Sequence, residues 1–316
     1  MMRRSSSSTS EPTARRRGSS ALGPRGREIF SRLFGDRTRA AAPVAEAATI
    51  AIASGKGGTG KSFLSTSLAV LFHRAGKRIT VVDCDFGLAC DHLLLGVNPK
   101  LTLRHLLCGQ GKLEEIRIET PAGPALLPGG SGIRQMANLS DTELLTFGKC
   151  LGKLAATEDL ILLDMGAGIS PQTILTLTSA DHVVLVTQPE IAALTDAYAV
   201  CKNLTQLRSD ARISVVVNRV MEPGQGRQAF DKLASVMQKF TGLQLTFLGE
   251  IAEDPAVTQR RLGQMPIVAT DPDAKIAREV AAIAERLEAT AGPLESRPVE
   301  NGNGLEARFT EQRLFL

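Results

Sequence analysis

The chain has little aromatic material: 4% of its 316 residues are aromatic, tyrosine occurs once and tryptophan not at all. This scarcity argues against an exposed stacking platform for single-stranded nucleic acid and against an aromatic-rich β-sandwich. The hydrophobic share is nevertheless 43%, which is enough for a substantial core. Ala, Leu, Val and Ile must fill that core, which suits an α/β protein.

Paired cysteines and long apolar runs are also missing. The five cysteines are odd in number and form no C-x-x-C pair, so neither a zinc site nor an iron–sulfur site is indicated. Free thiols fit a reducing cytosol. No apolar stretch approaches the roughly 18 residues of a membrane-spanning helix. The N-terminal arginines precede no apolar run of the kind found in a secretory signal.

Positive charge is concentrated near the N-terminus. Residues 1–47 hold ten Arg and four acidic residues, a net of +6, and because the whole chain carries +4, the rest carries −2. An acidic core weighs against a nucleic-acid partner, and so against a chromosome-partition role.

Composition divides the chain into three parts. Residues 1–47 are predicted to be a basic, mostly disordered tail. Within it, residues 26–36 form a short amphipathic segment. Residues 48–289 are predicted to be one ordered domain, and 290–316, rich in Pro, Gly, Asn and Glu, a flexible C-terminal tail. The amphipathic segment places four apolar residues on one helical face: Ile29, Phe30, Leu33 and Phe34.

The ordered domain alternates apolar runs with helical periodicity. The runs interpreted as strands cover 49–53, 79–82, 160–163, 182–186 and 213–217. The expected helices cover 61–75, 140–155, 190–208, 227–240 and 273–289. Strands that are apolar throughout are typical of parallel sheets, whose two faces are both buried. The predicted fold class is α/β, with a doubly wound, mostly parallel sheet.

A glycine-rich loop between the first strand and helix matches G-x-x-x-x-G-K-[ST]. Its glycines allow backbone N–H groups to converge on phosphate oxygens, and the helix N-terminus adds partial positive charge. Lys61 is expected to reach the β- and γ-phosphates, and the Ser62 hydroxyl to hold Mg²⁺. The motif is Gly55-Lys56-Gly57-Gly58-Thr59-Gly60-Lys61-Ser62.

Carboxylates end two further strands. Asp83 and Asp85 close V-V-D-C-D, and Asp164 closes L-I-L-L-D. The carboxyl ends of parallel strands face the nucleotide in open α/β sheets. One carboxylate of the first pair is suited to a Mg²⁺-bound water and the other to orienting the attacking water. An acidic strand-end turn is the alternative interpretation of that pair. Asp164 is interpreted as a Walker B residue that supports Mg²⁺.

These motifs resemble those of the MinD/ParA ATPases, because Lys56 gives the loop the deviant form K-G-G-x-G-K-[ST]. The resemblance implies a MinD-like P-loop fold that binds ATP and Mg²⁺. It also implies slow, dimer-dependent hydrolysis in a homodimer formed with ATP, in which Lys56 reaches the partner's phosphates. Asp83 is then on the metal side, and Asp85 is the catalytic residue of switch I.

Two later segments resemble the family's adenine pocket. Val217-Asn218-Arg219 is similar to the strand end whose Asn binds the base, and residues 251–255 are similar to the loop that packs on it. Asn218, Arg219 and Pro255 are therefore implied in nucleotide binding. No Asn-Lys-x-Asp guanine pattern occurs, so ATP rather than GTP is expected.

The stretch 83–96 is similar to switch I of the flagellar number regulators, the FlhG/FleN/YlxH branch, except that Cys90 and His92 stand where that branch has Asn and Asp. This similarity implies a regulator of flagellar number or placement, with a flagellar GTPase or basal-body component as partner. The branch's N-terminal GTPase-stimulating element has no match in residues 1–47. A MinD-like division-site regulator and a nucleotide-gated adaptor with negligible turnover remain open.

The expected location is the cytoplasm, with reversible peripheral association with the plasma membrane. The segment 26–36 is the expected anchor, because arginines surround its apolar face. Docking of this face onto the protein's own core or onto a partner is the alternative.

Overall fold

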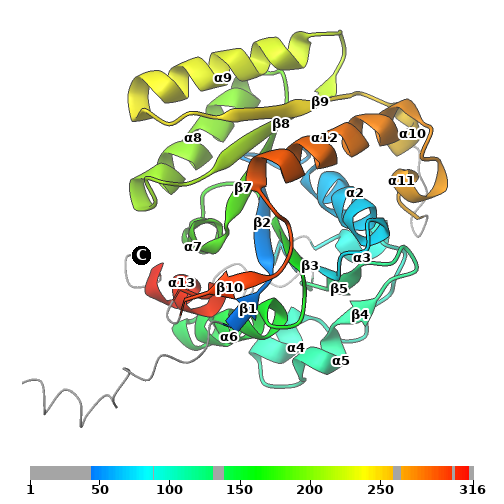
Figure 1. Cartoon of the computed structure of the whole chain (residues 1–316), viewed down its shortest axis with the longest axis vertical. Coiled ribbons are helices and arrows are strands. Elements are labelled where there is room, and N and C mark those ends of the chain that lie inside the picture. The colour runs from blue at the N-terminus through cyan, green and yellow to red at the C-terminus, as the bar shows by residue number, and fades with distance from the viewer. Residues whose placement is uncertain (1–43, 88, 131–138, 259–264, 301–302, 313–316) are drawn as a thin grey trace, which may run out of the picture. The chain divides into compact units, whose positions relative to one another are not determined.

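The computed structural model describes residues 44–87, 89–130, 139–258, 265–300 and 303–312, all within one compact unit (Figure 1). The basic tail up to residue 43 and its amphipathic segment lie outside the described residues. Among the described helices, none has the length and apolar character needed to cross a bilayer.

An eight-stranded sheet forms the centre of this unit, in the order β4-β5-β3-β6-β2-β7-β8-β9. Every neighbouring pair is parallel except β4 and β5. The predicted α/β class and mostly parallel sheet are thereby confirmed. The strands are β2 (Ala48–Ala53), β3 (Ile79–Cys84), β4 (Ile118–Glu119), β5 (Ala125–Leu127), β6 (Leu160–Met165), β7 (His182–Thr187), β8 (Ile213–Val220) and β9 (Thr246–Ala252).

Helices cover both faces of the sheet, and alternate strand residues serve the two layers. Ile50 and Ile52 of β2 join one buried cluster, while Ala51 and Ala53 join the other. The first layer contains α2 (Lys61–Arg74), α11 (Ile267–Thr270) and α12 (Lys275–Ala291). The second contains α6 (Asp141–Ala155), α7 (Pro171–Ser179), α8 (Ile191–Leu207) and α9 (Gln225–Thr241). Short helices are α3 (Asp91–Leu94), α4 (Leu103–Leu107), α5 (Leu113–Ile116) and α10 (Pro255–Thr258).

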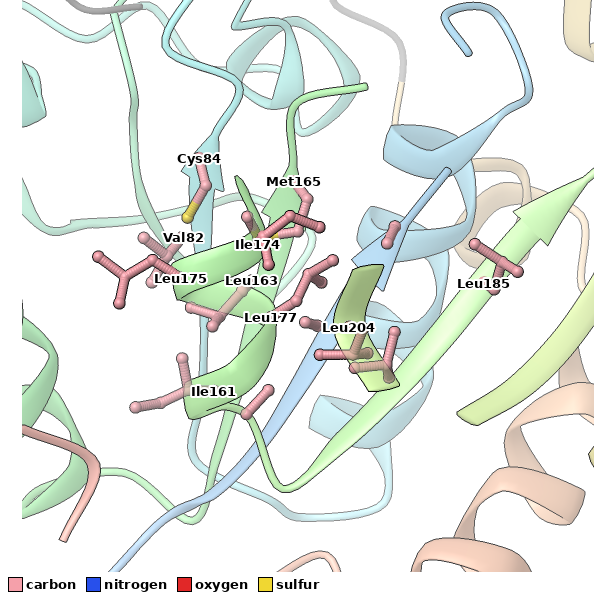
Figure 2. Packing of buried hydrophobic residues seen from close by; sticks show 14 of the residues in the cluster. Val82, Cys84, Ile161, Leu163, Met165, Ile174, Leu175, Leu177, Leu185 and Leu204 are labelled. Carbon is pink, nitrogen blue, oxygen red and sulfur yellow. The ribbon is translucent and has the colours of Figure 1, made fainter. Parts of the chain in front are cut away.

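Helix α7 shows how the second layer packs. Its Ile174, Leu175 and Leu177 are buried among side chains of β3 and β6, and Leu204 of α8 belongs to the same cluster (Figure 2). This packing fixes the loops that leave the carboxyl ends of β3 and β6, where Cys84 and Met165 lie (Figure 2).

The C-terminal segment differs from the flexible tail expected over 290–316, because much of it is ordered. Strand β10 (Arg297–Val299) pairs with β1 (Val44–Glu46), and α13 (Leu305–Gln312) contacts α6 and α7. Leu305 and Phe309 are 0% and 1% exposed. Their i, i+4 spacing gives α13 one apolar face, but two apolar residues in a polar segment leave only a faint sequence signal.

Glycines of α6 make room for this helix. A Cβ at Gly148 would lie 3.0 Å from the Phe309 ring, and one at Gly152 would lie 2.8 Å from the Glu306 carboxylate. Phe309 contacts Phe147 edge to face at 5.5 Å between ring centroids, and Phe147 contacts Phe86 in the same way at 5.6 Å. A row of three rings therefore joins α13 to the loop after β3.

Candidate nucleotide-binding site

The sheet order gathers the predicted site residues at one edge. The glycine-rich loop follows β2, with β6 and β3 on one side of it and β7 and β8 on the other. Asp83 and Asp164 are direct register partners near the carboxyl ends of β3 and β6. Asn218 lies near the end of β8. Because parallel strands end at a common edge, residues far apart in sequence meet around this loop.

Three glycines of the loop are required by backbone conformation or by close packing, and Gly58 is one of them because its φ is +75°. Gly60 has φ +94°, and a Cβ there would lie 2.1 Å from Asn218 Nδ2. A Cβ at Gly55 would lie 2.3 Å from the Asp196 backbone. At Gly57 and Gly58, by contrast, a Cβ would meet nothing within 4 Å. The loop is therefore tightly packed at its ends and open in its middle, where a phosphate chain would approach.

Side chains from neighbouring strand ends hold the loop's carbonyl groups. Gln188 Nε2 donates to Gly58 O at 3.1 Å, and Asn218 Nδ2 donates to Thr59 O at 2.8 Å. Ser54 Oγ donates to Lys56 O at 2.7 Å. Carbonyl oxygens held in this way are kept from turning toward a phosphate, which they would repel. These hydrogen bonds pre-organise the loop for an anion.

The two loop lysines have different surroundings. Lys61 begins α2 and is 7% exposed. The Lys56 side chain is 30% exposed, and its Nζ forms an ion pair with Glu190 Oε2 at 2.7 Å. The hydrogen bond from Lys56 lowers the pKa of Glu190. Since exposed ion pairs contribute little stability, Lys56 can exchange this partner for another anion at small cost.

Three carboxyl groups cluster beside the hydroxyl group of Ser62, the last residue of the glycine-rich motif. Ser62 Oγ donates to Asp164 Oδ2 at 2.5 Å. Asp83 accepts from the backbone N–H groups of Asp85 and Asp91, at 3.1 and 3.2 Å. Oxygens of Asp83, Asp91 and Asp164 all lie within 4.8 Å of one another, and all three residues are buried. Such an arrangement of oxygen ligands suits a divalent cation.

Burial raises the pKa of each of these acids. Burial first, and then the nearby Asp164, raise the pKa of Asp83 to about 8. Burial raises the pKa of Asp164 to about 6, against the lowering effects of Ser62 and Lys61. The pKa of Asp91 is raised well above its usual range, again mainly by burial. Full ionisation of the cluster therefore needs a compensating cation.

Asp85 is not one of the three clustered acids, but it is close enough to raise the pKa of Asp83 and Asp164, and it lines a cavity of about 210 Å³. Its Oδ1 accepts from Gly87 N at 3.2 Å. The cavity is lined by residues of the loops after β3 and β6 and of α7, among them Phe86, Gly166 and Thr173. This position suits a residue that orients a small molecule such as water.

The residues implied in adenine binding lie at the ends of β8 and β9. Asn218 Oδ1 accepts from Arg219 N at 2.9 Å, so in this structure the amide is engaged with protein groups. Arg219 has φ +59° and forms an ion pair with Glu253 at 2.6 Å. Pro255 begins α10. The three residues lie on one side of the loop, opposite the carboxyl cluster in the strand order.

Residues 50–267 match the model of the CobQ/CobB/MinD/ParA nucleotide binding domain. The chain belongs to the MinD/ParA family. It is 36% identical to the flagellum site-determining protein YlxH of Helicobacter pylori, over 69% of this chain and 74% of that protein. It is 30% identical to the antiactivator FleN of Pseudomonas aeruginosa, over 79% of this chain and 88% of that protein. The septum site-determining protein MinD of Pyrococcus horikoshii, solved with Mg-ADP, is 28% identical with TM-score 0.66, covering 78% of this chain and 97% of that one.

Several residues of this MinD/ParA site were not among the predicted site residues, although two of the segments that contain them, 188–190 and 195–198, resemble the flagellar-regulator branch. Gln188 and Glu190 hold the P-loop and Lys56, and the polar Q-P-E after an apolar strand is a signal that could have identified them. Asp196 packs on Gly55, and Asp91 completes the carboxyl cluster. Both lie in stretches that resemble family motifs, but no role was assigned to them, because their partners are distant in sequence.

Proposed function

We propose that this chain is an ATP-binding and ATP-hydrolysing dimerisation switch of the MinD type. The position of Lys56 carries the proposal. Lys61 already supplies a cation from the buried start of α2, whereas Lys56 lies at the accessible rim of the loop in an exchangeable ion pair with Glu190. A second, accessible lysine is suited to the phosphates of a nucleotide bound by another subunit, where it would act as an arginine finger does.

The oxygen ligands at the site fit Mg²⁺. Ser62, Asp83 and Asp164 would hold the ion, and Asp164 Oδ1 is buried without a hydrogen-bond partner among the described residues. When bound, Mg²⁺ neutralises charge on the phosphate oxygens. Lys61 binds the phosphates, and the hydrogen bond between Ser62 and Asp164 orients the hydroxyl. Asp85, beside the cavity, orients the attacking water.

The biological role proposed here is control of flagellar number or placement. FleN and YlxH are named as an antiactivator and as a flagellum site-determining protein. A partner of the corresponding kind is a flagellar GTPase or a basal-body component. Division-site regulation and a nucleotide-gated adaptor with negligible turnover are the competing roles.

ATP should convert the protein from monomer to dimer. In an Asp85→Ala background, which blocks turnover, light scattering should show twice the monomer mass with ATP and Mg²⁺ at micromolar protein, and the monomer mass with GTP. The added change Lys56→Ala should shift the equilibrium back toward monomer, because it removes the cation that reaches the second nucleotide. A monomer that persists with saturating ATP contradicts the proposal. Dimerisation without any turnover, even with membranes and partners, favours the adaptor.

Membrane binding is proposed to follow the dimer. The C-terminus is the alternative anchor. Its Leu305 and Phe309 are buried in the domain, whereas Leu314, Phe315 and Leu316 lie outside the described residues. The segment 26–36 remains the proposed anchor. One copy should bind anionic vesicles weakly, whereas two copies on a dimer gain a factor of about 10²–10⁴ through avidity.

Vesicle co-sedimentation with ATP measures this effect. Deleting residues 1–40 should release the protein from the vesicles. Deleting residues 1–24, which spares the amphipathic segment, is the matched control and should retain most of the binding. Binding that survives the longer deletion would show that the anchor lies elsewhere.

A further inference from the structure

We propose that Asp91 is a third metal-binding carboxylate, which gives this chain a divalent-cation site that fills before nucleotide arrives. The inference concerns the Mg²⁺ side of the proposed ATP site and in that respect rests on the proposed function. Ser62, Asp83 and Asp164 are the residues that the motifs assign to the ion. Asp91 is outside those motifs, between the departures Cys90 and His92.

The distances fit a single ion. Two oxygen ligands of one ion lie at most about 4.2 Å apart for Mg²⁺, whose ligands are at about 2.0–2.1 Å, and about 5 Å apart for the larger Ca²⁺. The oxygens offered by Asp83, Asp91 and Asp164 are within 4.8 Å of one another. One ion can therefore contact all three carboxylates after side-chain rotations that shorten these distances by a few tenths of an ångström, with the backbone unchanged.

The hydrogen bonds leave three oxygens of the cluster for a ligand. Asp83 uses both of its oxygens to accept backbone N–H groups, and Asp164 uses Oδ2 to accept from Ser62. No N–H or hydroxyl group among the described residues donates to Asp164 Oδ1 or to either oxygen of Asp91, although these residues are 1% and 0% exposed. The two carboxyl groups are close enough to share a proton, and a divalent ion would replace that proton. Buried polar atoms without donors are uncommon and call for a ligand that the protein does not supply.

Asp91 is held in place by its own backbone. Its N–H donates to Asp83 Oδ2 at 3.2 Å, so the two acids are coupled directly. It begins α3, which packs on α2, and Leu95 at the end of α3 is fully buried. The backbone on both sides of the buried carboxylate is therefore anchored, by Asp83 before α3 and by Leu95 after it.

The charges near the cluster point to a divalent ion. Three carboxylates carry three negative charges when ionised, and Lys61 is the cation that acts on Asp164. Asp85 adds further negative charge, because it raises the pKa of both Asp83 and Asp164. The site therefore carries an excess of negative charge that one Mg²⁺ or Mn²⁺ would largely balance. Carboxylate and hydroxyl oxygens are the ligands that these hard cations prefer.

Manganese binding to the nucleotide-free full-length protein tests the inference. The concentration of free Mn²⁺ is measured from its electron paramagnetic resonance signal during the titration. Wild-type protein should bind one Mn²⁺ per chain with a dissociation constant below about 100 μM, on the order expected for three carboxylates. Asp91→Asn should weaken this binding at least tenfold.

The matched control is Glu158→Gln. Glu158 is also a buried carboxylate, 4% exposed, but it pairs with Arg117 before the start of β6, away from Asp164. Its replacement should leave Mn²⁺ affinity unchanged. Circular dichroism of both variants shows whether a loss of Mn²⁺ binding accompanies a loss of folding, and a folded Asp91→Asn protein with wild-type Mn²⁺ affinity contradicts the inference.

Thermal unfolding provides a second readout. In EDTA, Asp91→Asn should melt at the same temperature as wild type or higher, because it removes a buried acid that lacks a donor. Added Mn²⁺ should raise the melting temperature of wild type and of Glu158→Gln but not that of Asp91→Asn.

Two outcomes overturn the inference: wild-type protein that binds no Mn²⁺ without nucleotide at millimolar concentration, or equal Mn²⁺ affinity in wild type and Asp91→Asn. Neither outcome bears on the proposed switch, because ATP-dependent dimerisation is measured separately. Conversely, a nucleotide-free Mn²⁺ site in a protein that stays monomeric with ATP would support Asp91 and contradict the switch.

Discussion

Replacing Lys61 with alanine should weaken ATP binding at least 100-fold, about 2.7 kcal/mol, whereas Lys56→Ala should leave affinity within about threefold. Lys61 is nearly buried at the start of α2, next to Asp164, so its loss removes a desolvated charge from the phosphate site. Lys56 lies on the rim and pairs with Glu190. Its loss should instead abolish dimer-dependent hydrolysis.

A fluorescent ATP analogue measures the two affinities, and phosphate release measured against protein concentration reports dimer-dependent turnover. Thr66→Ala, on a buried position of α2 one turn beyond the loop, is a control for general damage to this helix. Equal loss of affinity in both lysine variants would show that the assigned roles are wrong.

Replacing Phe309 with alanine should destabilise the domain by about 3–5 kcal/mol, as loss of a fully buried phenylalanine does. The ring is 1% exposed and packs on Phe147 and beside Gly148. Collapse around the cavity is restricted, because α6 and α7 both hold α13. Urea unfolding followed by circular dichroism measures the change in free energy.

Glu311→Ala is the matched control on the same helix, because Glu311 is exposed. It should change stability by less than about 0.5 kcal/mol. A Phe309→Ala effect as small as that of the control would mean that the C-terminal segment contributes nothing to the fold, as the composition first suggested.

The fold was predictable because its strongest signals are local. Apolar runs and helical periodicity located the five central strands and the long helices to within a few residues. The P-loop and the aspartates at strand ends were likewise found from short motifs. These residues come together because the sheet is parallel. Asp83 and Asp164 lie near the carboxyl ends of the neighbouring strands β3 and β6, where they are register partners.

The rest depended on contacts that no short pattern records. Asp91 became part of the site through the way the loop after β3 returns to the sheet edge. Strand β9 was not predicted, because Gly249 and polar residues interrupt its apolar pattern. Helix α13 was missed because its stability comes from the surface of α6 that accommodates it.

If two subunits associate as proposed, the Lys56–Glu190 pair makes that association an exchange of ionic partners. In the proposed dimer Lys56 leaves a carboxylate for a phosphate chain, so the net electrostatic gain is the difference between two attractions. A small difference favours reversibility, since neither state holds the lysine strongly. Added salt screens both attractions together. The monomer–dimer equilibrium should therefore depend less on ionic strength than it would if Lys56 had no counterion in the monomer.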